Sequence, residues 1–163
     1  INARAWTRLK GLVDDAVSEG ATLLAGGERP AGLNAGHYLA PTVLTDVTET
    51  MAVYREETFG PIVSIVPFDT KTDLLRMAND CEEGGLTAYI FTRNLARAEH
   101  YAARLRYGEI QINGVKYDID LPHGGIGQSG IGHECSALAL HDYLVHKRIT
   151  RALDTTTFGG LNP

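Results

Sequence analysis

Two acids and an aromatic ring stand close together in the segment Glu56-Glu57-Thr58-Phe59-Gly60-Pro61. A carboxylate accepts hydrogen bonds from hydroxyl groups, and an aromatic ring packs on a flat heterocycle. Glu57 and Phe59 could therefore serve a single ligand that carries both kinds of group. A solvated acid and a core phenylalanine at a strand entrance explain the same residues, so chemistry alone leaves both interpretations open.

Residues 125–130, Gly-Ile-Gly-Gln-Ser-Gly, match the glycine spacing of a dinucleotide-binding turn. Such a turn needs a strand directly before the glycines and a helix N-terminus where the pyrophosphate sits. Here the preceding predicted strand ends near Asn113, and no acidic residue ends a second strand at the distance that ribose binding needs. The pattern favours close packing of backbone on backbone over a phosphate site.

The cysteines and histidines offer little nucleophilic or metal chemistry. Cys81 and Cys135 lie far apart without a CxxC pattern, and the histidines are single, so we expect no metal site and no triad. Cys135 precedes a predicted short helix and has His133 two residues away, which could lower the pKa of a thiol. We expect both cysteines to be ordinary small residues, with Cys135 as a catalyst kept as an alternative.

Composition describes an acidic globular chain. The 163 residues are 44% hydrophobic and 21% charged, with a net charge of −5, values that exclude disorder and collagen-like repeats. Lys and Arg are scattered, so we expect no nucleic-acid partner. No apolar run reaches the roughly 20 residues of a membrane span, and unpaired thiols suit a reducing cytoplasm, so we expect a cytoplasmic protein without membrane contact.

In the first half of the chain, the spacing of apolar residues and the positions of glycine and proline predict the elements. Apolar residues at helical spacing predict a helix over 3–19, which Gly20 would end. A short apolar strand follows in 21–27. Pro41 favours an edge strand over a central one in the extended segment 37–47. The β-branched run 61–68 is typical of a strand covered on both faces, as in a parallel sheet.

The second half alternates between strands and helices. Thr70 or Thr72 could cap a helix that runs to about Asn79, and Asn94 could cap a second one. With strands at 86–92 and 109–113, this order implies right-handed crossovers and a three-layer α/β/α parallel-sheet domain. The remaining segments are a long glycine-rich loop over 114–134, a short helix over 136–144 and a last strand over 145–153.

Taken together, the segments resemble the C-terminal part of an NAD(P)-dependent aldehyde dehydrogenase. Five stretches match family patterns in order: EGATLLAGG with GHYLAPTVL, REETFGPIVSI, MANDCEEGGLTAYIFTRN, GEIQIN, and LPHGGIGQSGIGHE. The second of these is similar to the family's E-E-x-F-G-P signature. The resemblance implies a domain over 1–144 that is part of the catalytic domain, and an oligomerisation strand and tail over 145–163.

The resemblance assigns roles to particular residues. Glu57 matches the carboxylate that holds the nicotinamide ribose hydroxyls of NAD or NADP, and Phe59 matches the ring that packs near the nicotinamide. Asn113 ends the strand that leads into the aldehyde-pocket loop, so we expect four substrate-pocket residues: Asn113, Lys116, Tyr117 and His123. His123 stands where the family usually has Phe. With Lys116, it suggests a polar aldehyde, such as a hydroxy-aldehyde.

The resemblance also leaves parts of the family's mechanism outside this chain. The cysteine that attacks the aldehyde and the glutamate base both precede the E-E-x-F-G-P motif in the family, whereas Cys81 and Cys135 follow it. We therefore expect no catalytic residue here, no activity of the chain alone, and assembly of the arm into a homodimer or homotetramer. The alternative is a non-catalytic truncated paralogue that acts as an oligomerisation or binding module.

Overall fold

The computed structural model describes residues 1–69, 73–80 and 84–151. Its first element is the helix α1, Ala3–Ser18, which begins because the Asn2 side chain accepts a hydrogen bond from the backbone N–H of Ala5 at 2.8 Å. The helix stops before Gly20, whose φ of +110° suits glycine. One face of α1 is buried, so the helix predicted from periodicity is confirmed; the buried residues are Leu9, Leu12, Val13 and Ala16.

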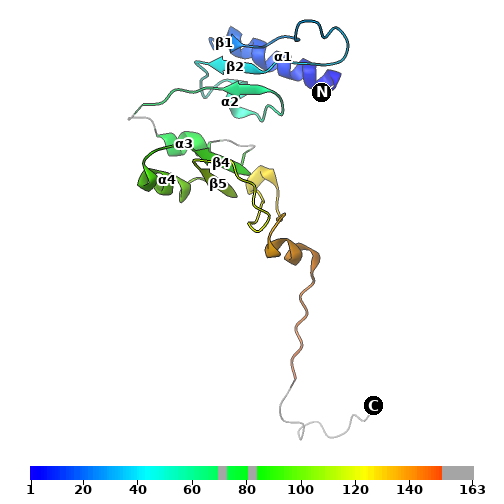
Figure 1. Ribbon diagram of the computed structural model, residues 1–163, viewed down its shortest axis with the longest axis vertical. Helices are drawn as coiled ribbons and strands as arrows, with labels where there is room; N and C mark the ends of the chain where they lie inside the picture. Colours follow the sequence, from blue (N-terminus) through cyan, green and yellow to red (C-terminus); the bar gives the residue numbers. More distant parts are fainter. Residues whose placement is uncertain (70–72, 81–83, 152–163) are drawn as a thin grey trace, which may run out of the picture.

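A small mixed sheet lies against α1 (Figure 1). Its strands are β1, Thr22–Ala25, β2, Thr42–Thr45, and β3, Ile62–Ser64. The central strand β2 pairs antiparallel with β1 and parallel with β3. The expectation that Pro41 marks an edge strand is therefore wrong: Pro41 comes directly before the first residue of β2, so its missing N–H takes nothing from the ladder.

The main hydrophobic core lies between α1 and this sheet. Leu9 and Val13 of α1 meet Leu44 of β2 and Ile62 of β3, all less than a tenth exposed. The short helix α2, Ala52–Arg55, adds Val53 to the same cluster. This core fixes the segment that follows α2, where the Glu57 and Phe59 candidates lie.

The second body of the structure holds α3, Leu74–Asn79, β4, Thr87–Ile90, α4, Leu95–Ala102, and β5, Glu109–Ile112 (Figure 1). Strands β4 and β5 pair in parallel across the α4 crossover, as their order predicted. Asn94 caps α4 through a bond from the Arg97 N–H, which confirms that prediction. The cap of α3 is Asp73; the predicted caps Thr70 and Thr72 lie outside the described residues.

The described residues form an α/β structure with two separate small sheets. This corrects the expectation of a three-layer domain built on one parallel sheet. The run predicted as a strand covered on both faces becomes strand only over Ile62–Ser64, and Val63 is 58% exposed. Helix α1 packs on one face of β1–β2–β3, and Val63 remains more than half exposed.

The C-terminal third is mostly irregular. The loop after β5 contains a 3₁₀ turn at Gly127–Ser129 and an antiparallel bridge between His123 and Glu134. The predicted short helix is a 3₁₀ helix, Ala137–Tyr143. Residues 144–151 then extend away from the body without pairing to any described strand (Figure 1). Within the described ranges, no helix is both long and apolar enough to cross a bilayer.

Candidate functional site

A hollow of about 430 Å³ opens beside β5 and the loop that follows it. Three of the residues predicted for a substrate pocket, Lys116, Tyr117 and His123, line it together. The strand supplies the wall because its register is fixed by pairing with β4, and the loop curls back over it. The hollow is therefore framed on one side by regular structure and on the other by irregular chain.

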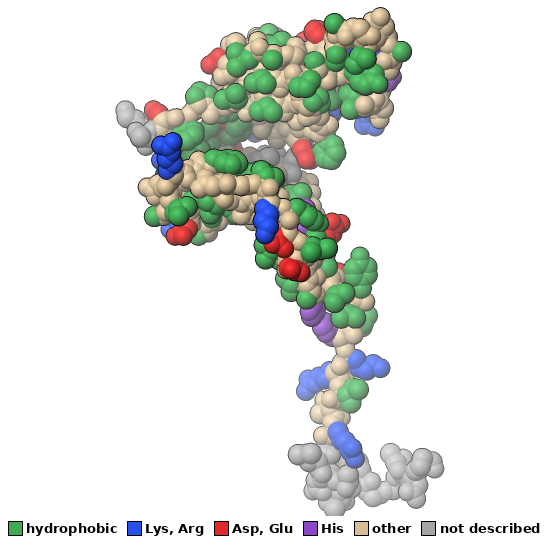
Figure 2. All heavy atoms as spheres, in the orientation of Figure 1, with side chains coloured by type: hydrophobic (Ala, Val, Ile, Leu, Met, Phe, Trp, Pro, Cys, Tyr) green, Lys and Arg blue, Asp and Glu red, His purple; other side chains and the backbone are tan. Residues whose placement is uncertain are grey.

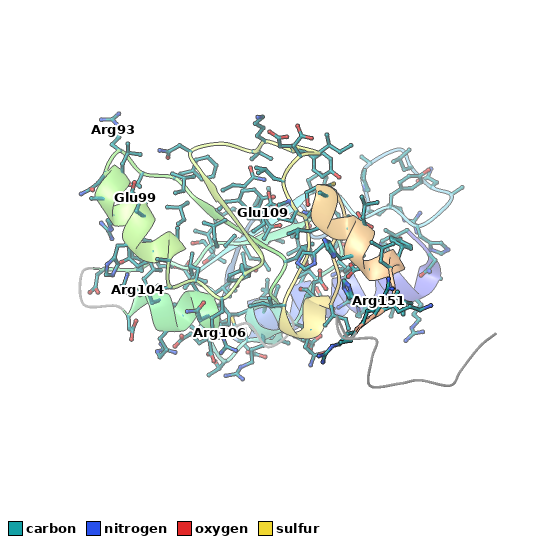
Figure 3. The ribbon with its side chains drawn as sticks, turned by 90° about the horizontal axis from the view of Figure 1, so that it is seen from below. Arg93, Glu99, Arg104, Arg106, Glu109 and Arg151 are labelled. Carbon is teal, nitrogen blue, oxygen red and sulfur yellow. The ribbon has the colours of Figure 1, made fainter. Side chains whose placement is uncertain are left out.

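Glu109 is the most highly coordinated side chain of this hollow. Its Oε2 lies 2.9 Å from Nδ1 of His123 and accepts a bond from the Thr87 hydroxyl at 3.3 Å, while its Oε1 accepts from the Gln111 amide at 2.6 Å. The bond with His123, followed by those from Gln111 and Thr87, holds the pKa of Glu109 below its ordinary value. Figure 3 shows Glu109 toward the middle of the molecule.

Lys116 places a cation at the mouth of the hollow. Its backbone N–H donates to the Gln111 side-chain oxygen at 2.6 Å, which fixes where the loop leaves β5. Its ammonium group lies 2.8 Å from a carboxylate oxygen of Asp118. This bond raises the pKa of Lys116 and lowers that of Asp118, so the pair is ionised over the physiological range. The Lys116 side chain is 80% exposed.

Tyr117 connects the hollow to Cys135. The Tyr117 hydroxyl and the Cys135 sulfur lie 2.8 Å apart, and this contact raises the pKa of Tyr117. The Tyr117 ring also meets the His123 ring edge to face at 6.1 Å. The described partner of Cys135 is thus a phenol instead of His133, whose backbone N–H is bonded to Asp142. Cys81 lies outside the described residues.

Asn113 has a different place from the other predicted pocket residues. Its side-chain oxygen accepts from the backbone N–H of Thr92, and its amide donates to the Thr92 carbonyl, both at 2.8 Å. These two bonds tie the end of β5 to the end of β4. Asn113 is not among the residues that line the hollow, so its side chain holds the two strand ends together.

The predicted nucleotide residues lie in the turn between α2 and β3. Phe59 is 80% exposed and has a φ of +47°, a left-handed conformation that costs a non-glycine residue about 1–2 kcal/mol. Glu57 is exposed and borders a second, shallower hollow with Gly85, Thr87 and Ser129. Thr87 connects the two hollows, because it lines the shallower one and its hydroxyl donates to Glu109, which lines the first.

Close packing, which the sequence favoured for the glycines at 125–130, holds for Gly125, whereas Gly127 and Gly130 have positive φ values in open surroundings and serve the turn. A Cβ on Gly125 would lie 2.5 Å from the Ser129 side chain, and one on Gly124 would lie 2.5 Å from the carbonyl oxygen of Gly132. A Cβ on Gly85 would collide with the carbonyl oxygen of Ile126. The loop therefore lies directly on neighbouring backbone.

Sequence reasoning missed Glu109, Gln111 and Arg8. Glu109 and Gln111 are two residues apart on β5 and so point to one face, and a polar pair in an otherwise apolar strand is a signal that could have found them. Arg8 donates to the backbone carbonyls of Glu57 and Thr58. No local pattern predicts a contact between residues about fifty positions apart.

Comparison with known proteins gives a consistent result along the chain. The model of the aldehyde dehydrogenase family matches residues 1–149. A peroxisomal aminoaldehyde dehydrogenase 1 of Pisum sativum is 35% identical over the whole chain and 32% of its own length. A mitochondrial succinate-semialdehyde dehydrogenase of Oryza sativa subsp. japonica is 40% identical over 91% of the chain and 28% of its own length.

A solved structure agrees with these sequence matches. The Mycobacterium tuberculosis aldehyde dehydrogenase complexed with NAD⁺ superposes with a TM-score of 0.80 at 35% identity. The match covers 86% of this chain and 29% of that one. The chain thus spans about a third of the length of the relatives that it matches. Since the family model covers most of the chain and the fold agrees, the chain belongs to the aldehyde dehydrogenase family.

Proposed function

We propose that this chain is the C-terminal part of an NAD(P)-dependent aldehyde dehydrogenase, which oxidises an aldehyde to a carboxylic acid through a cysteine thiohemiacetal. The observation that carries the proposal is the turn Glu57–Gly60, where an exposed acidic residue and an exposed aromatic residue stand two positions apart in a chain of this family. The attacking cysteine and the glutamate base belong to polypeptide beyond these residues. The chain alone is then inactive.

The residues of the turn fit a nicotinamide nucleotide. The Glu57 carboxylate can accept hydrogen bonds from ribose hydroxyls, and the Phe59 ring, 80% exposed, offers a flat apolar face to a planar ring. When bound, NAD or NADP supplies the hydride acceptor. The part played by this chain is to hold and orient the ribose and to keep that side of the nicotinamide dry.

Lys116, Tyr117 and His123 form the substrate-pocket wall in this proposal. Their hollow carries a cation, a phenol and an imidazole, and these groups favour an aldehyde that bears polar groups, such as a hydroxy-aldehyde. The names of the two plant relatives, an aminoaldehyde and a succinate-semialdehyde dehydrogenase, also refer to aldehydes with a polar end. Asn113 supports this wall from the strand end.

Replacement of His123 by Phe tests the substrate class in the complete enzyme. Loss of the imidazole removes a hydrogen-bonding group from the hollow, so kcat/KM for a hydroxylated aldehyde falls about tenfold relative to an alkyl aldehyde of equal length. Lys147→Met, on the arm, is the control and leaves the ratio unchanged. An unaltered ratio in His123→Phe contradicts the assignment.

The extended segment after residue 144 supplies oligomer contacts in a homodimer or homotetramer. An unpaired extended segment is a template for pairing with a second chain.

We also propose a cytoplasmic location for the protein. The plant relatives are named as peroxisomal and mitochondrial proteins, so fractionation of the producing cell tests this point.

The intact mass of the protein made by its own cell tests the whole proposal. A species well above 17.7 kDa that reduces NAD⁺ or NADP⁺ in the presence of an aldehyde is the expected result. A species of 17.7 kDa that assembles but shows no aldehyde-dependent reduction supports the alternative, a non-catalytic oligomerisation module.

A further inference from the structure

We infer that Arg8 is a positioning residue, which holds the Glu57–Gly60 turn in the conformation that presents Glu57 and Phe59. The inference rests on the proposed function for its meaning, because Arg8 acts on the nucleotide through the turn. Arg8 lies on α1, about fifty residues before the turn. Its guanidinium donates to two successive carbonyls, that of Glu57 at 3.4 Å from Nη1 and that of Thr58 from Nη2.

The two bonds suit arginine in particular. The guanidinium presents its N–H donors in a rigid planar fork, whereas a lysine ammonium is a single compact charge on a flexible stem. The two carbonyls belong to successive peptide planes that meet at the Cα of Thr58, so one fork that reaches both fixes how these planes are rotated relative to each other. The second of these peptides joins Thr58 to Phe59, whose φ of +47° is the strained position of the turn.

The base from which Arg8 acts is rigid. The next residue, Leu9, is fully buried in the core between α1 and the first sheet. Leu9 also contacts the far end of the turn, since a Cβ on Gly60 would lie 2.7 Å from one of its methyl carbons. Helix α1 therefore holds the turn at two points, with a polar contact at Glu57 and Thr58 and an apolar contact at Gly60.

Backbone bonds anchor the segment on both sides of the Arg8 contact. The Glu56 N–H donates to the Ala52 carbonyl at 2.9 Å, and the Ile62 N–H donates to the Gly60 carbonyl at 2.8 Å. Arg8 acts between these anchors. Loss of its guanidinium should loosen the turn locally and leave α2 and β3 in place.

The test compares the backbone order of Thr58 and Phe59 by NMR relaxation in wild type, Arg8→Met and Arg8→Lys. The wild-type order parameters should be near 0.85, and Arg8→Met should lower them below about 0.6 at both residues. Arg8→Lys keeps the charge but loses the fork, so it should give intermediate values. Arg4→Met removes an exposed arginine from the same helix and is the matched control.

Unchanged order at Thr58 and Phe59 in Arg8→Met overturns the inference, as does an equal loss of order at Ile62, which would mean general destabilisation. If Arg8→Met does not fold, the Arg8→Lys values decide. Titration of the same variants of the complete enzyme with NAD⁺ separates the inference from the proposed function. The dissociation constant should rise about tenfold in Arg8→Met. A complete wild-type enzyme whose turn signals do not respond to NAD⁺ counts against the nucleotide clamp, and the order parameters still decide the role of Arg8.

Discussion

Glu109 shows how a strand residue acquires its properties from partners far along the chain. Its carboxylate gathers bonds from β4, from β5 itself and from the following loop, through Thr87, Gln111 and His123. The side chains of Glu109 and His123 are 24% and 30% exposed, so the pair is partly shielded from water. It therefore fastens the loop to the sheet more firmly than a fully exposed ion pair would.

We expect Glu109→Gln to lower Tm by about 3 °C at neutral pH, because a partly shielded charged hydrogen bond contributes about 1 kcal/mol. The folded-state pKa of Glu109 lies below its ordinary value of 4.5. This stabilisation is therefore fully present above pH 4.5 and is lost as the pH falls through the folded-state pKa.

Thermal unfolding followed by circular dichroism measures the gap in Tm between wild type and Glu109→Gln as the pH is lowered. The gap should close in acid. Glu99→Gln, at an exposed position on α4 near the edge of the molecule in Figure 3, is the control and should show no gap at any pH. A gap of constant size down to about pH 3 would contradict the role of the ionised carboxylate.

At the scale of elements, the loop after β5 lies so close to the second body that glycine is required at the contact. A Cβ on residue 108 would collide with the carbonyl oxygen of Gly124 and lie 2.9 Å from its carbonyl carbon. Backbone carbonyls cannot move aside as a flexible side chain does. The start of β5 and the glycine-rich loop are therefore one packed unit.

Gly108→Ala should lower Tm by about 5 °C, since overpacking costs about 1–3 kcal/mol. Gly11→Ala is the matched control: its Cβ would meet nothing within 4 Å on α1. Alanine there should raise stability by about 0.5–1 kcal/mol. Differential scanning calorimetry measures both variants, and a Gly108→Ala protein as stable as wild type would show that the loop can move away.

At the scale of the whole molecule, the arm after residue 144 differs in charge and packing from the rest. Figure 2 shows Lys and Arg side chains gathered along it, and the chain as a whole carries a net charge of −5. Val145 is 96% exposed, and Ile149 is also almost fully exposed. In this basic extended segment the exposed apolar residues alternate with charged ones, so we expect it to pair with an acidic surface, which in the proposed assembly belongs to a second copy of this chain.

Deletion of residues 145–163 should reduce the assembly to a smaller species, and high salt should weaken the intact assembly because exposed charges are screened. Size-exclusion chromatography with light scattering measures both effects. Lys147→Glu with Arg148→Glu is the companion variant and should weaken association with the length kept. If the number of subunits is unchanged after the deletion, the arm does not supply oligomer contacts.

The sequence by itself determined the local elements and the family. Periodicity and capping chemistry predicted α1 with its C-terminal end and the start of α4, and the crossover order predicted the parallel pairing of β4 with β5. These features depend on residues within one or two turns of each other, or on the handedness of a single connection. The ordered motifs predicted the aldehyde dehydrogenase family, which the comparisons confirm.

The tertiary structure decided which of the candidate residues meet. The loop curls back onto β5 and thereby brings together Lys116, Tyr117 and His123. Asn113, the residue directly after β5, is bonded to Thr92 instead. The strands divide into two sheets, and β2 takes the central place in the one whose core lies against α1. Contacts such as that of Arg8 with Glu57 join residues far apart in sequence. Such contacts depend on how complete elements pack, and no local pattern of side chains encodes that.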